Sequence, residues 1–348
     1  MANIHPLATV HPNAKLGKNV EVGPYAYIEE HVEIGDGSKI LPHATIFNYV
    51  KMGKNCCVFP GAVVGAVPQD LKFDGEVTYV EIGDNVNIRE CATINRGTKA
   101  SGRGVTKIGN NVLLMSYTHV AHDCTVGNNC ILVSYVGIAG ETDVDDWATL
   151  GGSTVAHQFS RIGKHAFVGG GSKINKDVPP YVLCGRDPLS YAGVNIVGLR
   201  RRGFTSEQIY AIKDMYDIIY NSGMNVSDAL AKIASGFPQS EERDTILEFI
   251  RGSKRGIIRG ADSNVKGSIE EGGQTFFYGI FPSRFLFCRD GRGYEGIDQQ
   301  TGRRQFYGTV SVCRIYRGLR ELSEAVIQEQ MLFLCSRRGA GPHFSCCA

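Results

Sequence analysis

Apolar side chains recur at every sixth position over much of this chain. A first series runs from Ile4 to Val64, and every member is aliphatic or methionine; a second runs from Ile108 to Ile174. Neither an amphipathic helix nor an alternating strand has this period. A hexapeptide solenoid does, because three short strands make one triangular coil and each sixth side chain points into the prism. The pattern therefore predicts a left-handed parallel β-helix.

Glycine often follows these inward positions, as at Gly17, Gly35 and Gly127. The chain has 43 glycines in 348 residues, against a usual frequency of about 7%. A residue without a side chain suits a sharp turn between two faces of a prism. Stacked coils would bury one continuous aliphatic column, with each coil contacting mainly its neighbours.

Two stretches interrupt the sixfold series. The apolar residue is lost at Asp70 and Glu76, and the phase breaks in 96–106, which is rich in Gly, Ser, Thr and basic residues. We expect 66–79 and 96–106 to be loops that project from the prism. Binding residues often lie on loops carried by a rigid scaffold, although simple tolerated insertions are the alternative.

The repeat is expected to end at Val178-Pro179-Pro180-Tyr181, because proline cannot donate to a β-ladder. From Gly198 the spacing becomes helical. Thr205-Ser206-Glu207-Gln208 has the form of a capping box, and Ser227 and Ser240 are expected to begin two further helices. We therefore predict a β-helix over residues 1–184 and a small α-helical domain over 185–260.

The last stretch, 261–348, has neither the sixfold repeat nor a motif. Five of the 11 cysteines fall within it. A further domain is one interpretation; we favour a disordered or aberrant extension, such as an out-of-frame readthrough.

Composition narrows the possible classes of function. The net charge of +2 gives no overall attraction to nucleic acid. The sequence has no CxxC spacing and no long apolar run. Its first residues lack a basic region followed by an apolar one, so we do not expect a secretory leader. We therefore expect a cytoplasmic protein without stable membrane insertion, in which the cysteines before residue 200 are buried small hydrophobes.

Histidines gather on the second sixfold series. His119 and His122 lie on either side of the inward Val120, so we expect His122 on the outer surface of the prism. Steps of one coil, about 18 residues, predict one vertical patch that contains His119, His122, Gly140, His157 and Gln158.

Such a patch could perform general-base catalysis. A neutral imidazole can take a proton from a hydroxyl group while its oxygen attacks an acyl carbonyl. Asp123 could orient the base, and a glycine N–H could stabilise the oxyanion. Surface histidines without a role and a metal site are the alternatives.

Several motifs together resemble one family, the acyl-carrier-protein–UDP-N-acetylglucosamine O-acyltransferases, which perform the first step of lipid A synthesis. The resemblance covers about residues 1–258. The motifs are Gln69-Asp70-Leu71-Lys72-Phe73, Asn95-Arg96-Gly97-Thr98, His119-Val120-Ala121-His122-Asp123-Cys124, Val155-Ala156-His157-Gln158-Phe159, Gly193-Val194-Asn195-Ile196 and Leu199-Arg200-Arg201-Arg202-Gly203-Phe204.

The resemblance implies a role for each matching position. His122 would be the base that deprotonates the glucosamine 3-hydroxyl for attack on a 3-hydroxyacyl thioester, Asp123 would support it, and the Gly140 amide would bind the oxyanion. Gly170 would set the acyl length and admit a long chain. The implied substrate-binding residues are Gln69, Asp70, Lys72, His119, His157 and Gln158, with Asn195 and Arg202 on the nucleotide side.

The same resemblance implies a homotrimer with active sites between adjacent prisms, acyl carrier protein as the donor, and no metal or diffusible cofactor. The basic run at 200–202 would attract the acidic carrier protein. Two positions depart from the family pattern. Glu141 stands where a histidine is common, and 186–189 differs from the usual polar run.

Three other functions compete with this interpretation. The N-acyltransferase of the same pathway has an additional N-terminal domain, for which a repeat that starts at Ile4 leaves no room. An acetyl-CoA-dependent hexapeptide acetyltransferase is disfavoured by the helical domain and the motif set. A trimeric β-helix carbonic anhydrase would hold a metal between subunits, but the spacing of His119 and His122 fits that pattern poorly.

Overall fold

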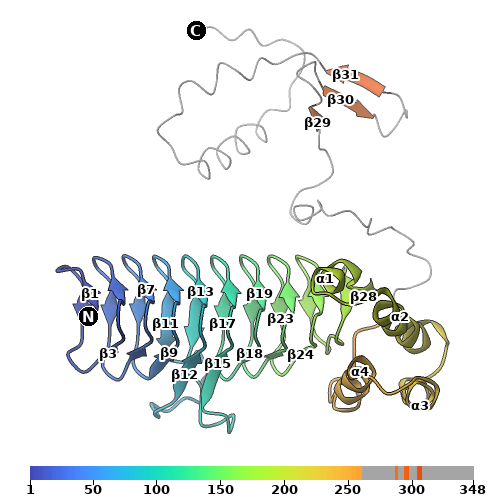
Figure 1. Cartoon of the computed structure of the whole chain (residues 1–348), viewed down its shortest axis with the longest axis horizontal. Coiled ribbons are helices and arrows are strands. Elements are labelled where there is room, and N and C mark those ends of the chain that lie inside the picture. The colour runs from blue at the N-terminus through green and yellow to red at the C-terminus, as the bar shows by residue number, and fades with distance from the viewer. Residues whose placement is uncertain (261–286, 289–293, 298–303, 308–348) are drawn as a thin grey trace. The chain divides into compact units, whose positions relative to one another are not determined.

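The computed structural model describes residues 1–260, 287–288, 294–297 and 304–307. The first of these ranges begins with short strands that alternate among three parallel sheets, so that each coil contributes one strand to each sheet. Figure 1 shows the coils stacked along one axis, with the helices at the far end.

The first sheet has 11 strands. In order across the sheet they are β1 (Asn3–Ile4), β4 (Glu21–Val22), β7 (Lys39–Ile40), β10 (Cys57–Val58), β13 (Asn87–Ile88), β16 (Leu113–Leu114), β19 (Ile131–Leu132), β22 (Thr149–Leu150), β25 (Phe167–Val168), β27 (Val182–Gly185) and β28 (Ser190–Val194).

The second sheet has nine strands and includes the strand that begins with His119. They are β2 (Thr9–Val10), β5 (Tyr27–Ile28), β8 (Thr45–Ile46), β11 (Val63–Ala66), β14 (Thr93–Asn95), β17 (His119–Val120), β20 (Gly137–Ile138), β23 (Val155–Ala156) and β26 (Lys173–Ile174).

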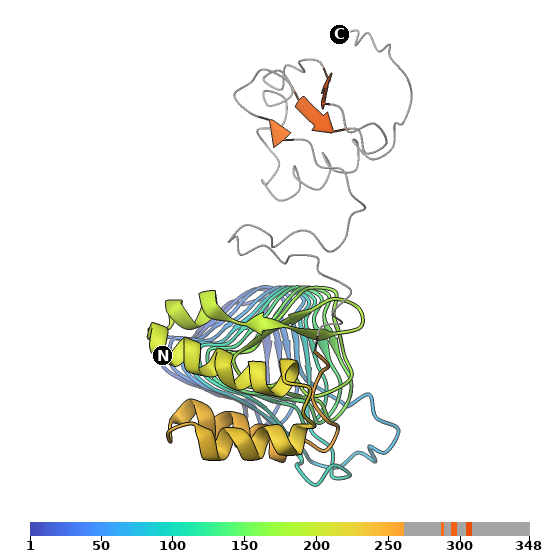
Figure 2. The ribbon, with the colours of Figure 1, turned by 90° about the vertical axis from the view of Figure 1, so that its right-hand side faces the viewer.

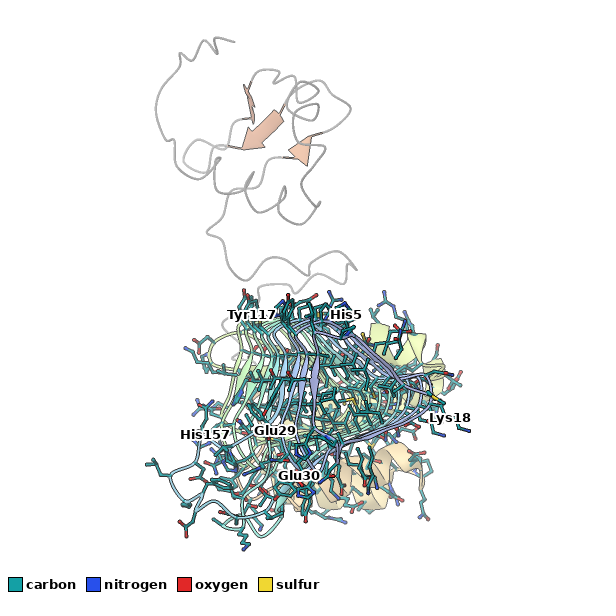
Figure 3. All side chains as sticks on the ribbon, turned by 90° about the vertical axis from the view of Figure 1, so that its left-hand side faces the viewer. His5, Lys18, Glu29, Glu30, Tyr117 and His157 are labelled. Atoms are coloured by element: carbon teal, nitrogen blue, oxygen red, sulfur yellow. The ribbon has the colours of Figure 1, made fainter. Side chains whose placement is uncertain are left out.

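The third sheet has eight strands. They are β3 (Lys15–Leu16), β6 (Glu33–Ile34), β9 (Val50–Met52), β12 (Tyr79–Ile82), β15 (Val105–Ile108), β18 (Thr125–Val126), β21 (Asp143–Val144) and β24 (Arg161–Ile162). Seen along the prism, Lys18, Tyr117 and His157 lie near its three different corners (Figure 3).

The predicted inward residues form the core. From Val22 onward they are buried, and Ile138 and Leu150 are fully buried. Ile4 is 44% exposed instead, because no coil packs below it. Of the six cysteines before residue 200, four are buried and two are half-buried, and all six are free.

The two predicted loops are present. Residues 67–78 connect β11 to β12, and residues 96–104 connect β14 to β15. Figure 2 shows both projecting from the same corner of the prism. A hydrogen bond of 2.8 Å from the Lys99 amide to Glu76 joins one loop to the other.

The prolines do not end the first sheet, contrary to expectation. Strand β27 pairs in parallel with β25, and β28 then pairs antiparallel with β27. Pro179 and Pro180 are tolerated because they occupy a corner between sheets, where no ladder hydrogen bond is required. The predicted domain boundary after residue 184 falls within β27, so the division into 1–184 and 185–260 stays a prediction.

Four helices follow: α1 (Ile196–Arg201), α2 (Ser206–Asn221), α3 (Val226–Gly236) and α4 (Glu241–Arg251). The capping box at Thr205 and Gln208 is confirmed, as is the cap at Ser240. Helix α3 begins earlier than predicted. Its cap is Asn225, whose side chain accepts the Asp228 amide, and Ser227 lies inside the first turn.

The chain divides into two compact units, 1–280 and 281–348. The described part of the second is a three-stranded antiparallel sheet of β29 (Phe287–Cys288), β30 (Tyr294–Ile297) and β31 (Arg304–Tyr307). The rest of the predicted extension lies outside the described residues.

Candidate functional site

A histidine–aspartate pair occupies the corner that follows β17. Nδ1 of His122 lies 2.9 Å from Oδ2 of Asp123. Because a carboxylate only accepts hydrogen bonds, Nδ1 carries the proton and Nε2 keeps a free lone pair. Asp123 adopts a left-handed backbone with φ of +59°, a conformation that Asp tolerates better than most residues. This turn brings its carboxylate back toward the ring, as an orienting role requires.

His122 is not on the open surface, contrary to expectation. It is only 8% exposed, although it lies outside the aliphatic column of the prism. The loop of residues 67–78 covers it, and Oδ2 of Asp70 lies 3.6 Å from Nε2. The sixfold repeat gives the direction of a side chain relative to the prism, but it cannot show what a loop places over that side chain.

Asp123 is fully buried and is held by neighbouring threonines. The N–H and the hydroxyl of Thr98 both donate to Oδ2, each over 2.9 Å. The amide of Asp123 donates to Oγ1 of Thr106 over 2.8 Å. Among the described residues, Oδ1 has no hydrogen-bond partner. The carboxylate is therefore fixed through one of its two oxygens.

Gly140 lies one coil above His122, as the repeat predicts. A β-carbon built at this position would overlap Cε1 and Nε2 of the imidazole, so the site requires glycine. The next residue, Glu141, donates its amide to the carbonyl of His122 over 3.0 Å. Within the described chain no acceptor is paired with the Gly140 N–H. The amide is thus available near the Nε2 edge of the ring.

His119 lies on the strand that leads into this corner. Its Nδ1 is 2.7 Å from the hydroxyl of Thr93. Burial, and secondarily the charge on His122, lowers the pKa of His119. The His119 side chain is therefore kept neutral near pH 7 and can bind polar groups without adding charge.

Gln69, Asp70 and Lys72 lie on the covering loop. Oδ1 of Asp70 accepts the Lys72 amide over 3.0 Å, which closes a local turn. Lys72 also lines an open hollow of about 300 Å³ between the two loops. Lys99 lines the same hollow from the second loop. Gln69 is exposed. Of these three residues, Asp70 is the one that the structure brings to His122.

His157 and Gln158 lie one coil above Gly140. The His157 ring is exposed, and its Nδ1 is 2.8 Å from the carbonyl oxygen of Gln158. The structure thus places both residues on the predicted corner. The described contacts do not join either side chain to His122, which lies two coils away along the prism.

Asn195, which is buried, and Arg202, which is half-buried, both contact the buried His165 near the helices. The Asn195 side chain donates to the carbonyl of His165 over 3.0 Å and also caps α1 by accepting the Gly198 amide. Arg202 donates to Nδ1 of His165 over 3.2 Å and lies over the Trp147 ring. Burial lowers the pKa of Arg202. Their predicted nucleotide contacts stay predictions.

Gly170 follows the inward Val168 on the last complete coil and is exposed. A β-carbon there would lie 3.0 Å from the carbonyl oxygen of Gly152. A side chain at this position would therefore fill space on the outer face of the prism. The predicted selection of chain length stays a prediction.

Three residues near the predicted site have contacts that the sequence pattern does not predict: Thr98, Arg103 and His165. Thr98 and Arg103 lie on a loop without repeat phase, so their contacts could not be obtained by counting coils. Nη1 of Arg103 donates to the carbonyl of Asp123 over 2.9 Å. The only available signal for Thr98 was its place in the Asn95-Arg96-Gly97-Thr98 motif.

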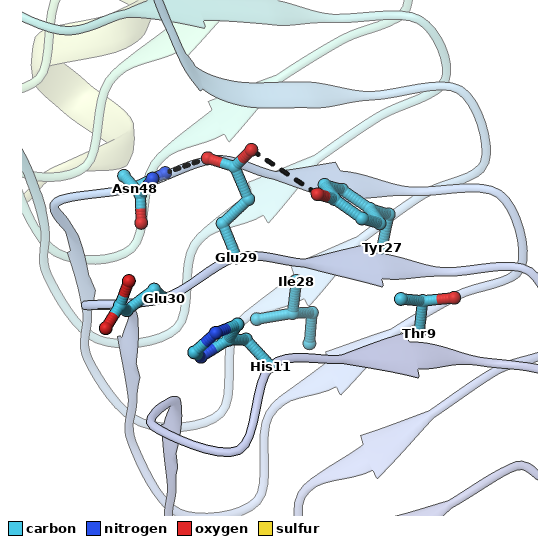
Figure 4. A pocket seen from close by; sticks show the side chains of 7 residues that line it. All are labelled: Thr9, His11, Tyr27, Ile28, Glu29, Glu30 and Asn48. Atoms are coloured by element: carbon cyan, nitrogen blue, oxygen red, sulfur yellow. Dashed lines mark hydrogen bonds between the residues drawn. The ribbon is translucent and has the colours of Figure 1, made fainter.

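A second hollow, of about 210 Å³, lies near the N-terminal end of the prism, where His11, Glu29, Glu30 and Asn48 line it (Figure 4). Both of its carboxylates accept hydrogen bonds from neighbouring residues of the prism. Glu29 accepts the Asn48 amide over 2.9 Å, and Glu30 accepts the side-chain amide of Asn13 over 2.9 Å. This hollow has neither a His–Asp pair nor an adjacent free glycine amide.

The described residues contain no group of three or more His, Cys, Asp or Glu side chains that could hold a metal ion. None of their helices is long and apolar enough to cross a membrane.

A triangular prism of hexapeptide coils with a His–Asp pair at one corner defines the hexapeptide-repeat transferase class. In agreement, the profile of the bacterial transferase hexapeptide family matches residues 13–48 and 106–140. The profile described as UDP-N-acetylglucosamine O-acyltransferase, domain 2, matches residues 177–258.

Relatives and solved structures narrow the class to one family. An acyl-[acyl-carrier-protein]–UDP-N-acetylglucosamine O-acyltransferase from Thiobacillus denitrificans is 47% identical over 259 residues, which are 74% of this chain and 100% of the relative. A UDP-N-acetylglucosamine acyltransferase structure from Bacteroides fragilis is 51% identical, with a TM-score of 0.72, and covers 74% of this chain and 100% of its own. The Francisella novicida structure is 39% identical, with a TM-score of 0.72 and coverage of 75% and 95%. The chain belongs to the acyl-carrier-protein–UDP-N-acetylglucosamine O-acyltransferase family.

Proposed function

We propose that this protein transfers a long-chain (R)-3-hydroxyacyl group from acyl carrier protein to the 3-hydroxyl of UDP-N-acetylglucosamine, the first step of lipid A biosynthesis. Membership of the family supports the reaction. The observation that carries the chemistry is the buried His122–Asp123 pair, which faces Gly140 one coil above.

His122 is the general base in this proposal. Its Nδ1 proton is held by Asp123 over 2.9 Å, so Nε2 can accept the proton of the sugar hydroxyl as the oxygen attacks the thioester carbonyl. The ionised Asp123 then stabilises the imidazolium that forms. The low exposure of both residues strengthens this electrostatic interaction, because water is excluded from the pair.

The Gly140 amide is the proposed donor to the developing oxyanion. It has no acceptor among the described residues, and it belongs to a residue whose β-carbon, if it had one, would overlap the Nε2 edge of the ring. A donor already in place costs no reorganisation when negative charge develops on the carbonyl oxygen. Collapse of the tetrahedral intermediate releases the carrier thiolate, which takes the proton from His122.

Further groups would position the substrates. We assign Gln69, Asp70, Lys72, His119, His157 and Gln158 to substrate binding, Asn195 and Arg202 to the nucleotide, and Gly170 to selection of chain length. Asp70 supports this assignment most directly, because its carboxylate is 3.6 Å from Nε2 of His122. A substrate hydroxyl bound there could contact both groups.

The proposal includes a cytoplasmic homotrimer whose active sites lie between adjacent prisms. The basic residues at 200–202 would attract the acidic carrier protein. The predicted domains 1–184 and 185–260 would then supply catalysis and carrier contacts, respectively. No metal or diffusible cofactor enters the proposed reaction.

The reaction is tested by incubating the purified full chain with a 3-hydroxyacyl carrier protein and UDP-N-acetylglucosamine. Mass spectrometry should detect a product heavier by one acyl group, and fragmentation should place that group on the 3-oxygen. Carrier protein without an acyl group is the control. A properly folded protein that forms no ester with a panel of chain lengths would refute the proposal.

A further inference from the structure

The loop of residues 96–104, which lies outside the repeating coils, makes hydrogen bonds to the aspartate of the His122–Asp123 pair. Thr98 is fully buried, and both its amide and its hydroxyl donate to Oδ2 of Asp123. The same oxygen lies 2.9 Å from Nδ1 of His122. One residue of the loop thus supplies two of the three hydrogen bonds to the oxygen that orients the imidazole.

The distribution of these bonds over the carboxylate is uneven. Oδ1 is buried and has no partner among the described residues. Rotation of a carboxylate about its terminal torsion is soft and roughly two-fold, so the neighbouring groups decide which oxygen faces the ring. Thr98 fixes Oδ2 as the oxygen that faces the imidazole, because both of its hydrogen bonds to the carboxylate are made to Oδ2. Without its hydroxyl, Asp123 would hold His122 less firmly.

Arg103 fastens the same loop to the prism. Its guanidinium forms two hydrogen bonds with Asp143, of 2.6 and 3.0 Å, and also donates to the carbonyl of Asp123. Asp143 belongs to β21, which pairs with β18 of the coil below. The planar guanidinium suits this two-point contact with a carboxylate. The loop that carries Thr98 is therefore attached to the prism through Arg103.

We propose that Thr98 is a positioning residue for the acyl transfer. It acts through Asp123, keeping His122 turned so that Nε2 meets the sugar hydroxyl, and it does not contact the substrates. This inference rests on the proposed function. The competing explanation is that Thr98 merely fastens its loop, in which case its loss would lower stability without acting through Asp123.

The variant Thr98→Val removes the hydroxyl and keeps both the shape and the amide. We expect kcat to fall about 10-fold or more, the scale of one lost hydrogen bond to a charged group, while both KM values stay within about twofold. Thr98→Ser should restore kcat to within about threefold of wild type. The matched control is Thr78→Val, since Thr78 is buried on the companion loop but its hydroxyl has no partner among the described residues.

A double-mutant cycle separates positioning from folding. In an Asp123→Ala background, Thr98→Val should change kcat by less than about twofold, because the group through which Thr98 acts is absent. An equal loss in both backgrounds would overturn the inference, as would an unchanged kcat in Thr98→Val. Thermal unfolding and size analysis show whether Thr98→Val folds. If it does not, the same double-mutant cycle is measured with Thr98→Ala and Thr98→Ser. Inactive wild-type protein would refute the proposed function instead.

Discussion

Gly140 lies so close to His122 that a β-carbon at position 140 would overlap the Cε1 and Nε2 atoms of the imidazole. The two residues belong to successive coils, and the Glu141 amide donates to the His122 carbonyl over 3.0 Å. The coil above therefore forms the wall of the candidate site on the side of Nε2. A backbone amide can reach that space only if residue 140 has no side chain.

Gly140→Ala should therefore reduce activity strongly while the fold is kept. The methyl group would push the imidazole away from its position against the coil, and we expect kcat to fall by about 10²-fold, the lower end of what a general base contributes. Gly137→Ala is the matched control in the same coil, because the nearest atom to its added carbon is Cγ1 of Val155 at 3.8 Å. Equal activity of the two variants in steady-state assays would argue against a role for this wall.

His122→Ala should lower kcat by about 10²–10⁴-fold, the usual contribution of general-base catalysis. Asp123→Ala should have a smaller effect, of about 10–10³-fold, because the base remains but loses its orienting group. KM for UDP-N-acetylglucosamine should change little in either variant. The measurement is initial-rate kinetics of the purified full chain, with size analysis to verify assembly. Activity of His122→Ala within tenfold of wild type would exclude this histidine as the base.

The prism could be predicted from the sequence because its coils have a fixed length. Counting in sixes gives the inward residues, and counting in eighteens places Gly140 above His122. The count fails where a neighbouring coil is missing, as at the exposed Ile4. It also cannot distinguish a proline in a ladder from one at a corner, so the continuation through β27 was missed.

The surroundings of the proposed base could not be predicted in the same way. His122 is covered by Asp70, and Asp123 is held by Thr98, and both contacts come from loops outside the repeat. The conformation of such loops depends on contacts such as that between Arg103 and Asp143, which lie 40 residues apart. The motifs predicted which residues form the site, whereas the burial of the His122–Asp123 pair could be seen only in the structure.

Gly170→Met should shorten the preferred acyl chain. Gly170 is exposed on the last complete coil, and a side chain there would fill space that a long acyl chain could otherwise occupy. We expect kcat/KM to fall by at least 10-fold for the longest accepted donor and to fall less, or rise, for donors several methylenes shorter. The measurement is competition between carrier proteins loaded with different chains, followed by mass spectrometry. A uniform loss for all donors would show that Gly170 serves folding and not selection.

His165 makes the stability of the protein sensitive to mild acid. Burial, reinforced by the charges of Arg202 and Lys164, lowers the pKa of His165 to about 4 from an ordinary value of 6.5. Its Nδ1 accepts a hydrogen bond from Arg202 over 3.2 Å, which requires a neutral ring. Between pH 6.5 and about 4, His165 is protonated in the unfolded chain but stays neutral in the folded chain. The free energy of unfolding therefore falls as the pH falls through this range.

The prediction is tested by denaturant unfolding at pH 7, 6 and 5. One protein concentration is used throughout, because the proposed trimer would make the measured stability depend on concentration. Wild type should lose stability with each step, and His165→Asn should lose less per step even if it is weaker at pH 7. Asparagine cannot titrate and tolerates the left-handed φ of +60° at this position. His31→Asn is the control, because it removes an exposed histidine from a similar corner with φ of +54°. If His165→Asn and His31→Asn both keep the wild-type dependence on pH, the acid sensitivity arises elsewhere, and the lowered pKa of His119 would be the next cause to test.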